Sequence, residues 1–237
     1  MGFDCASRTH LGCRRKLNED AVLSSAERGI WAVADGMGGH DAGEVASAMV
    51  VDALSDFPAA SSLENLVGKV LAALESVNDA LIEMARGGFE KRVIGSTVVG
   101  LVADDAQYRC FWVGDSRAFR IRGNGIVQLT RDHSLVQDLV EAGMLKADEA
   151  ENHPNANVVT RAVGASEPLQ VDTVGGELRS GDVFLLASDG LTRVVAEAEL
   201  LDQISSNDLE AAADNLIELT LARGAPDNVS LVIVRVR

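Results

Sequence analysis

The sequence predicts an α+β protein in which two packed sheets are flanked by helices. Short β-rich runs bounded by Gly, Asp or Asn recur along the 237 residues. Several of these runs are continuously apolar, as expected of strands buried on both faces. Long helical blocks are inserted between runs of strands, so strands and helices do not alternate strictly. That order favours α+β layering over a doubly wound sheet.

The predicted strands share an apolar, β-branched composition. They cover residues 30–34, 93–102, 108–113, 118–121, 183–187 and 229–236. No low-complexity linker, internal repeat or charge block divides the chain, and its four prolines are scattered. A chain of this length can still be organised around one large core, so we expect a single domain over residues 1–237.

Two helical blocks separate the early strands. Asp41 and Glu44 have the spacing of a capping box, which predicts a helix over residues 41–56. Apolar residues from Leu63 to Met84 recur at helical spacing and predict a long amphipathic helix over 62–85, with this stripe facing the core. Later helices are predicted over residues 134–142, 148–151 and 207–223.

Composition excludes several classes of protein. The formal net charge of −15 repels nucleic acid and anionic membranes, so we expect neither as a partner. No apolar stretch is long enough to cross a bilayer, and the N-terminus matches neither a signal peptide nor a myristoylation site. The three cysteines lack zinc-like spacing, which is typical of reduced thiols in the cytosol. We therefore expect a soluble, cytoplasmic protein with no tail or membrane anchor after its last strand.

Acidic residues stand where apolar strands start or stop. They are Glu19 and Asp20, Asp35, Asp115, Asp189 and Asp227. Each alone has an ordinary explanation as turn chemistry. Five such positions together are harder to explain in that way, because converging strands would bring carboxylates together, and clustered carboxylates repel one another unless cations neutralise them. Ligands that are all oxygen select hard cations such as Mg²⁺ and Mn²⁺ over Zn²⁺.

Arg15 precedes the first acidic pair and offers donors that suit a phosphate dianion. Without the acidic residues, Arg15 would be interpreted as a surface residue in a basic run. With them, the pattern indicates metal-assisted phosphoester hydrolysis, in which metals lower the pKa of a bridging water and neutralise the phosphoryl oxygens.

The motifs together resemble the metal-dependent protein phosphatases (the PPM, or type 2C, family) in their compact bacterial form. The resemblance runs nearly end to end. It rests on Gly12-x-x-Arg15-x-x-Asn18-Glu19-Asp20, Asp35-Gly36-Met37-Gly38-Gly39-His40, Gly43-Glu44-x-Ala46-Ser47, Gly95-Ser96-Thr97, Gly114-Asp115-Ser116-Arg117, Asp132-His133-Ser134, Thr160-Arg161-Ala162-Val163-Gly164, Ser188-Asp189-Gly190-Leu191 and Asp227-Asn228-Val229-Ser230.

The resemblance implies a four-layer α-β-β-α sandwich, with two antiparallel β-sheets flanked by helices and a binuclear Mn²⁺ or Mg²⁺ centre at one end. It implies that Asp35, Asp189, Asp227 and the Gly36 carbonyl hold the metals, and that Glu19 and Asp20 help, partly through water. Arg15 is expected to bind the substrate phosphate. Asp115, with Asp189, matches the acid that shapes a third, weaker metal site.

The implied activity is hydrolysis of phosphoserine and phosphothreonine in proteins by direct attack of a metal-activated water, without a phosphoenzyme. Phosphorylated proteins are then the substrates, a bacterial Ser/Thr protein kinase is the opposing partner, and the enzyme is a monomer. Residues 135–157 resemble the family's flap, a segment over the site that influences substrate choice; a helical decoration without a catalytic role is the alternative.

Two positions depart from the family pattern. Met37 stands where the eukaryotic branch has the His that protonates the leaving oxygen. His40 follows shortly and is a candidate general acid, although a solvated loop His or protonation by a metal-bound water would also fit. Arg193 stands where bacterial members often carry Asp or Asn, which places a cation near the metal loop.

Three other functions remain compatible with the sequence. The first is a pseudo-phosphatase that binds without catalysis, against which the retained Arg15, Asp35, Asp189 and Asp227 argue. The second is a phosphatase for small metabolites, and the third is a protein in which the metal is purely structural.

Overall fold

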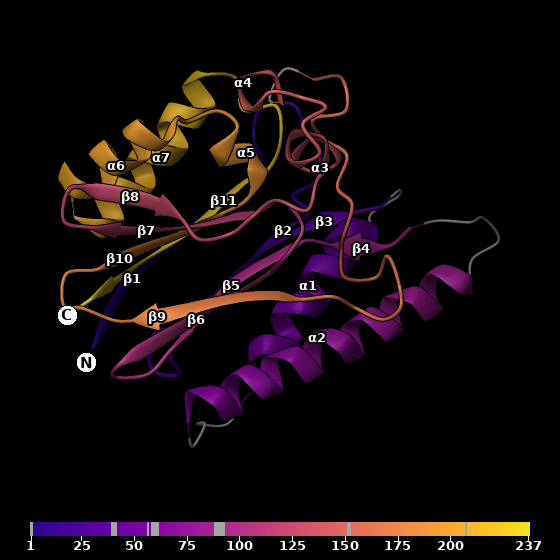
Figure 1. Cartoon of the computed structure of the whole chain (residues 1–237), viewed down its shortest axis with the longest axis horizontal. Coiled ribbons are helices and arrows are strands. Elements are labelled where there is room, and N and C mark those ends of the chain that lie inside the picture. The colour runs from indigo at the N-terminus through magenta and orange to yellow at the C-terminus, as the bar shows by residue number, and fades with distance from the viewer. Residues whose placement is uncertain are drawn as a thin grey trace.

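The computed structural model describes residues 2–38, 42–55, 57, 62–87, 93–150, 153–206 and 208–237, and two antiparallel sheets form its centre (Figure 1). The first sheet has the order β1-β11-β10-β7-β8. Its strands are β1 (Phe3–His10), β7 (Arg117–Arg122), β8 (Gly125–Gln128), β10 (Val183–Ala187) and β11 (Val229–Val236).

The second sheet has the order β2-β3-β5-β6-β9, with a short strand, β4, beside β3. Its strands are β2 (Asp20–Ser25), β3 (Ile30–Met37), β4 (Gly95–Ser96), β5 (Val98–Ala103), β6 (Gln107–Val113) and β9 (Asp172–Glu177). Every strand pair in both sheets is antiparallel.

Helices cover the outer faces of both sheets (Figure 1). Two pack on the second sheet, three lie on the side of the first, and two short ones lie in the connection between β8 and β9. They are, in that order, α1 (Ala42–Ser55) and α2 (Leu63–Arg86); α5 (Asp189–Thr192), α6 (Glu197–Ser206) and α7 (Leu209–Ala222); and α3 (Leu135–Glu141) and α4 (Ala147–Ala150). None of the helices in the described ranges is both long and apolar enough to span a bilayer.

Three apolar interfaces separate four layers, so the predicted α-β-β-α sandwich is confirmed. Successive side chains of a strand point to opposite faces. In β3, Ile30 and Ala32 therefore pack against α1 and α2, whereas Trp31 packs against the other sheet. In β10, Leu185 faces the helices and Phe184 faces the other sheet. Burial on both faces explains why these strands are continuously apolar.

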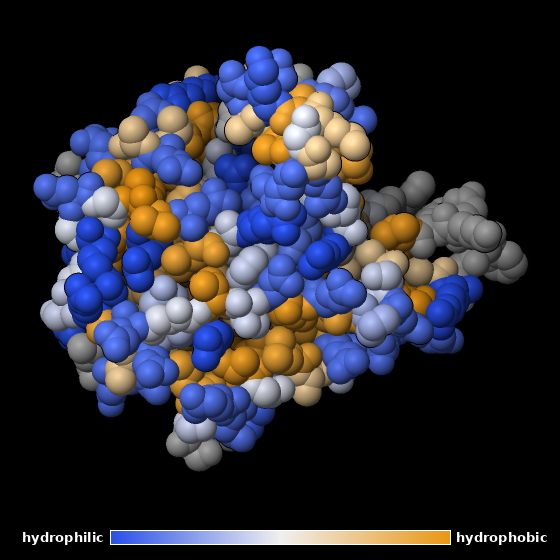
Figure 2. All heavy atoms as spheres, viewed as in Figure 1, coloured by the Kyte–Doolittle hydropathy of each residue, from blue (hydrophilic) through white to orange (hydrophobic). Residues whose placement is uncertain are grey.

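The long helix α2 forms close to its predicted bounds. The Ser62 hydroxyl caps it by accepting a hydrogen bond from the Asn65 N–H at 3.2 Å, and Arg86 lies in its last turn, where a cation suits the helix dipole. The predicted stripe is buried from Leu63 to Leu81, except for Val67, which is partly buried. Met84 is an exception and is 45% exposed, because the packed part of the helix ends one turn earlier. Figure 2 shows hydrophobic colour along the seam between α2 and the strands above it.

Other elements differ from their predictions. The single strand predicted over residues 93–102 is broken at Thr97 into β4 and β5, because Thr97 hydrogen-bonds the backbone of Asp35. The sequence pattern did not predict helices α5 and α6 or strands β1, β8 and β9, and the strand implied after Asp20 is β2. Apolar residues in the three missed strands alternate with polar residues or glycines. Residues 41, 56, 151 and 207, at the ends of predicted helices, lie outside the described residues.

The strand register brings the acidic segments to one end of the sandwich. Asp20 pairs directly with Asp35 in the β2–β3 ladder. In the other sheet, the last residue of β10 pairs near the start of β11, so the segments that carry Asp189 and Asp227 emerge side by side. Asp115 follows the end of β6. Residues distant in sequence thus meet at this end.

Candidate active site

A cavity of about 500 Å³ opens at this end, and we call it the acidic cavity. Its lining contains seven of the predicted site residues: Arg15, Glu19, Asp35, Gly36, Asp115, Asp189 and Asp227. Asp20 lies directly behind, as the ladder partner of Asp35. His40, the candidate general acid, lies outside the described residues.

Asp20 is a buried carboxylate with one satisfied oxygen. Its Oδ2 accepts a hydrogen bond from the Ser188 hydroxyl at 3.0 Å, whereas its Oδ1 has no hydrogen-bond partner. Burial, together with the charges of Asp189 and Asp227, raises the pKa of Asp20 to about 7. A buried, unpartnered oxygen of this kind is suited to a cation or retains a proton.

The neighbouring carboxylates have the same character. Burial raises the pKa of Asp35 well above its usual range, and the charges of Asp20 and Asp189 raise it further. Burial also raises the pKa of Asp189, although Arg193 opposes the shift. Like charges held together out of water favour proton or cation binding. Oxygen-only donors of this kind fit Mg²⁺ or Mn²⁺.

The carboxylates surround the cavity without forming a ready-made cage. Within the described ranges, no three Asp, Glu, His or Cys side chains are grouped closely enough to hold an ion as they stand. Two guanidinium groups lie among them instead. Arg15 contacts Asp227, and Arg193 contacts both Asp115 and Asp189. The chain's own cations therefore partly neutralise the carboxylates of the acidic cavity.

Arg15 lies at the cavity rim, with its Nη2 2.6 Å from Asp227 Oδ2. The loop that carries it turns at Gly12, whose φ is +78°, and passes against the backbone carbonyl of Asp227. A side chain at position 12 would clash with that carbonyl. The predicted neighbourhood of Arg15 and the acidic residues is therefore present.

Asn228 is a positioning residue for which the sequence predicted no role beyond its place in the motif Asp227-Asn228-Val229-Ser230. Its Nδ2 donates to the carbonyls of Leu11 and Leu17 at 2.8 and 3.0 Å, and its Oδ1 accepts from the Glu19 N–H at 2.9 Å. One buried amide thus fixes both ends of the loop that carries Arg15. An Asn directly after an acidic residue and before an apolar strand was the signal available in the sequence.

The backbone around Asp35 is also fixed from outside its strand. Its N–H donates to the Thr97 hydroxyl at 3.2 Å, and its carbonyl accepts from the Thr97 N–H at 2.8 Å. Thr97 also hydrogen-bonds Ser116, which follows Asp115. At Gly36, a Cβ would overlap the Gly43 carbonyl oxygen, so the chain can pass α1 only with glycine here.

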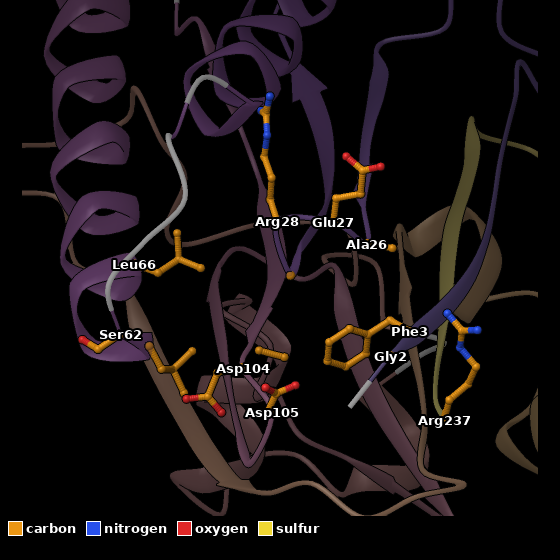
Figure 3. A pocket seen from close by; sticks show the side chains of 13 residues that line it. Gly2, Phe3, Ala26, Glu27, Arg28, Ser62, Leu66, Asp104, Asp105 and Arg237 are labelled. Carbon is orange, nitrogen blue, oxygen red and sulfur yellow. The ribbon is translucent and has the colours of Figure 1, made fainter.

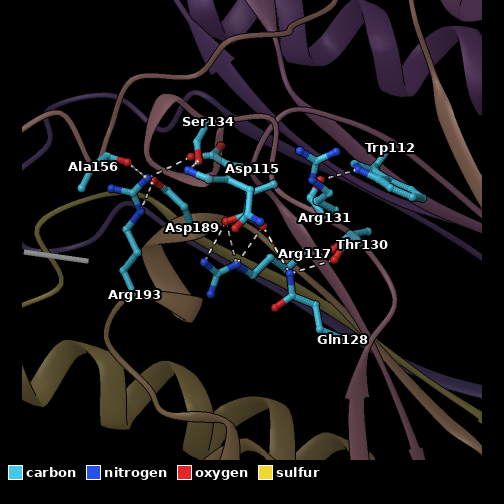
Figure 4. A network of polar contacts seen from close by, with 12 residues as sticks. Trp112, Asp115, Arg117, Gln128, Thr130, Arg131, Ser134, Ala156, Asp189 and Arg193 are labelled. Atoms are coloured by element: carbon cyan, nitrogen blue, oxygen red, sulfur yellow. Dashed lines mark hydrogen bonds and ion pairs between the residues drawn. The ribbon is translucent and has the colours of Figure 1, made fainter. Parts of the chain in front are cut away.

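Asp115 belongs to a polar network at the side of the cavity (Figure 4). Burial is the main cause that raises the pKa of Asp115 to about 7, and the charge of Asp189 adds to it. Arg193 donates to Asp115 Oδ2 at 2.9 Å and lies 3.0 Å from Asp189 Oδ2. Next to them, Arg117 makes a bidentate pair with Asp132. The sequence predicted a cation near the metal loop at Arg193 but not its contacts with Asp115 and Asp189.

The segment expected to be a flap contains α3 and α4, and residues 151–152 within it lie outside the described residues. Asn157 lines the acidic cavity, and the Ala156 carbonyl accepts from Arg193 at 3.1 Å. Figure 2 shows hydrophobic colour in this region. Met144 is 75% exposed and Val158, just beyond the segment, is 43% exposed. The exposed side chain of Val158 therefore lies between Asn157 and Val159 in the chain, two residues that line the acidic cavity.

A second cavity, the distal cavity, has a similar volume of about 530 Å³ and lies at the opposite end of the sandwich (Figure 3). Its charged residues serve local structure. Asp104 accepts from the N–H groups of Ala106 and Gln107, and Arg28 donates to the Ser55 carbonyl. Arg237 pairs with Asp4. Among the described residues that line it, the carboxylates of Glu27, Asp104 and Asp105 are exposed, in contrast to the buried carboxylates of the acidic cavity.

Comparison with known proteins gives a consistent result. The pattern of the family described as Protein phosphatase 2C matches residues 3–229. PstP of Mycobacterium tuberculosis, a serine/threonine protein phosphatase, is 35% identical over 231 residues, which make up 98% of this chain and 44% of PstP. The chain thus spans less than half the length of that relative.

Two solved structures are similar over nearly the whole chain. PppA, described as a key regulatory component of T6SS in Pseudomonas aeruginosa, is 44% identical with a TM-score of 0.91, over 99% of this chain and 98% of PppA. The catalytic domain of PstP in complex with two manganese ions is 32% identical with a TM-score of 0.88, over 100% and 99% of the two chains.

Proposed function

The chain belongs to the protein phosphatase 2C family, and from this membership we propose that it is a Mn²⁺- or Mg²⁺-dependent phosphatase that hydrolyses phosphoserine and phosphothreonine in proteins. One observation carries the proposal. Acidic residues from separate segments of both sheets line one cavity together with Arg15, and burial raises the pKa of several of them.

Asp35, Asp189, Asp227 and the Gly36 carbonyl hold two ions in this proposal, and Glu19 and Asp20 assist them. When bound, the ions supply a hydrolytic nucleophile at neutral pH and neutralise charge on the phosphoryl group. The carboxylates must lose their protons to bind cations. Burial raises the pKa of Asp20 to about 7, so cations would compete with a proton for this carboxylate near neutral pH.

Arg15 binds and orients the substrate phosphate. Its contact with Asp227 uses one terminal nitrogen, and a guanidinium has five N–H donors in a planar fork. The remaining donors suit phosphoryl oxygens, which accept charge-assisted hydrogen bonds. Arg15 therefore lies between one carboxylate of the centre and the place where the phosphoryl group enters. The general acid stays a prediction, with His40 as its candidate.

Protein substrates are favoured over small metabolites by the surface beside the cavity. Val158 is exposed next to Val159 of the cavity lining, and Met144 is exposed in the expected flap; exposed apolar side chains suit contact with a polypeptide better than with a sugar phosphate. The names of the relatives support the same substrate class, since PstP is a serine/threonine protein phosphatase.

The proposal also covers the partners of the enzyme, its oligomeric state and its domain organisation. The enzyme opposes a Ser/Thr protein kinase in a bacterial cytoplasm and acts as a monomer. Residues 1–237 form one catalytic domain in which residues 135–157 are the flap. The net charge of −15 supports the expectation that neither nucleic acid nor an anionic membrane is a partner.

The test is phosphate release from a phosphothreonine peptide, a sugar phosphate and a chromogenic monoester, each with Mn²⁺ and with chelator. We expect Mn²⁺-dependent turnover with a preference for the peptide. Similar rates on the sugar phosphate would favour a metabolite phosphatase. No turnover with Mn²⁺ would favour a binding module, and metal-dependent melting without turnover would indicate a structural metal.

A further inference from the structure

Arg193 places a cation between two of the acidic residues. It follows directly after the short helix α5, and its side chain returns toward Asp189 at the start of that helix. Its Nη2 donates to Asp115 Oδ2 at 2.9 Å, and its Nε lies 3.0 Å from Asp189 Oδ2. Figure 4 shows the guanidinium between these groups. One side chain therefore bridges a carboxylate after β6 and a carboxylate after β10.

The same two carboxylates are those for which the family resemblance implies a third, weaker ion. Asp115 is almost fully buried, with 5% of its side chain exposed. Its negative charge must therefore be compensated by a positive group close to it. The guanidinium already supplies a positive charge and a donor to each carboxylate. A divalent cation at this place would meet a fixed positive charge at contact distance. These residues do not fit a third ion while Arg193 stays in place.

Arg193 also holds the flap. Its Nη2 donates to the Ala156 carbonyl at 3.1 Å. Arg193 lines the acidic cavity and also a neighbouring cavity of about 110 Å³, which Ser134, Val136 and Ala156 help to enclose. Arg193 therefore borders both spaces, and its guanidinium connects the flap backbone to the carboxylates.

We propose that Arg193 replaces the third ion of the family with a resident cation, so that the centre holds two ions and its guanidinium docks the flap on Asp115 and Asp189. The inference rests on the proposed function, because it assumes that the acidic cavity is the metal centre. It assigns to Arg193 a positioning role in place of an exchangeable ion.

The test counts bound Mn²⁺ by electron paramagnetic resonance of the free ion during titration. We expect wild type to saturate at two ions per chain. Arg193→Ala should bind a third ion, more weakly than the first two. Arg193→Lys should stay at two, because it keeps the charge. The matched control is Arg8→Ala, since Arg8 also bridges two carboxylates, Glu210 and Asp214, at a similar 31% exposure but is not among the residues that line the acidic cavity. It should leave the count at two.

Hydrogen exchange of peptides over residues 153–158 is the second measurement. Arg193→Ala should speed exchange there, whereas Arg8→Ala should not. A third ion on wild type overturns the inference even if Arg193→Ala fails to fold. Two ions on every variant with unchanged exchange also overturn it, and leave the proposed function standing. No Mn²⁺ on wild type would overturn both.

Discussion

The two ends of the sandwich carry cavities of nearly equal volume, about 500 and 530 Å³, but their charged side chains differ in environment. At the acidic cavity, Asp20 and Asp115 are buried and have pKa values raised to about 7. At the distal cavity, Asp104 caps a turn and Arg28 binds a helix-end carbonyl. Cavity size therefore does not distinguish the site. The acidic cavity is distinguished by carboxylates of like charge that are held out of water.

The largest effect is expected from removing a carboxylate of the acidic cavity. Asp189→Asn should lower kcat/KM by at least about 100-fold, because it removes a metal ligand. The melting temperature should hold, since the substitution also removes a buried charge that repels its neighbours. The control at the distal cavity is Glu27→Gln, which should leave activity within about twofold of wild type. Equal losses of kcat/KM in both variants would contradict the placement of the active site at the acidic cavity.

A smaller effect is expected from removing the guanidinium at the rim. Arg15→Ala should raise KM by about 10-fold with a modest change in kcat, because it removes a phosphate contact and leaves the metal ligands in place. Steady-state kinetics on a phosphothreonine peptide measure this split. Arg28→Ala, which removes a guanidinium at the distal cavity, is the matched control and should leave KM unchanged. A normal KM with no turnover would contradict the role given to Arg15.

Asn228→Ala should destabilise the fold by about 1–3 kcal/mol, because three backbone groups lose their partner. It should also raise KM a few-fold through the loosened Arg15 loop. Urea unfolding measures the loss of stability, and kinetics on a phosphothreonine peptide measure the change in KM. Asp104→Ala removes a comparable backbone cap at the distal cavity and should cost stability alone. If Asn228→Ala left KM unchanged, the loop would not depend on this amide.

The smallest effect concerns pH. The pKa values of Asp20 and Asp115 are raised to about 7 in the folded protein, above their unfolded values near 4. These groups therefore stabilise the fold fully below about pH 4, and that contribution is lost as pH rises to about 7. In chelator, the melting temperature should fall by at least about 2 °C from pH 5 to pH 8. Mn²⁺ should reduce the fall, and Asp20→Asn should reduce it in chelator. If the melting temperature in chelator did not change between pH 5 and pH 8, the pKa values of these carboxylates would not be raised in the folded protein.

Much of the fold was predictable because strands buried on both faces have an unmistakable composition. β10 and β11 were predicted at their observed bounds for this reason. β9 was missed because it is an edge strand containing Gly175 and Gly176, where burial on two faces does not apply. β1 was missed because it is only partly buried and alternates toward polar residues.

The acidic residues of the site were predictable from their positions at strand boundaries, but their interactions were not. Nothing in the sequence shows that Asp20 and Asp35 form a ladder pair, because that depends on strand register. The contacts of Arg193 with Asp115 and Asp189 depend on the path of the chain after α5. The loop anchoring by Asn228 joins residues more than 200 positions apart, a pairing that only the folded chain reveals.

The apolar layer between the sheets has a consequence for the acidic cavity. Asp20 and Asp35 belong to one sheet, whereas Asp189 and Asp227 flank strands of the other. The thickness of that layer, set by side chains such as Trp31 and Phe184, therefore acts as a spacer that determines how far apart the two halves of the site stand. Substitutions in this layer can alter catalysis from a distance, and ions bound between the halves would clamp one sheet to the other.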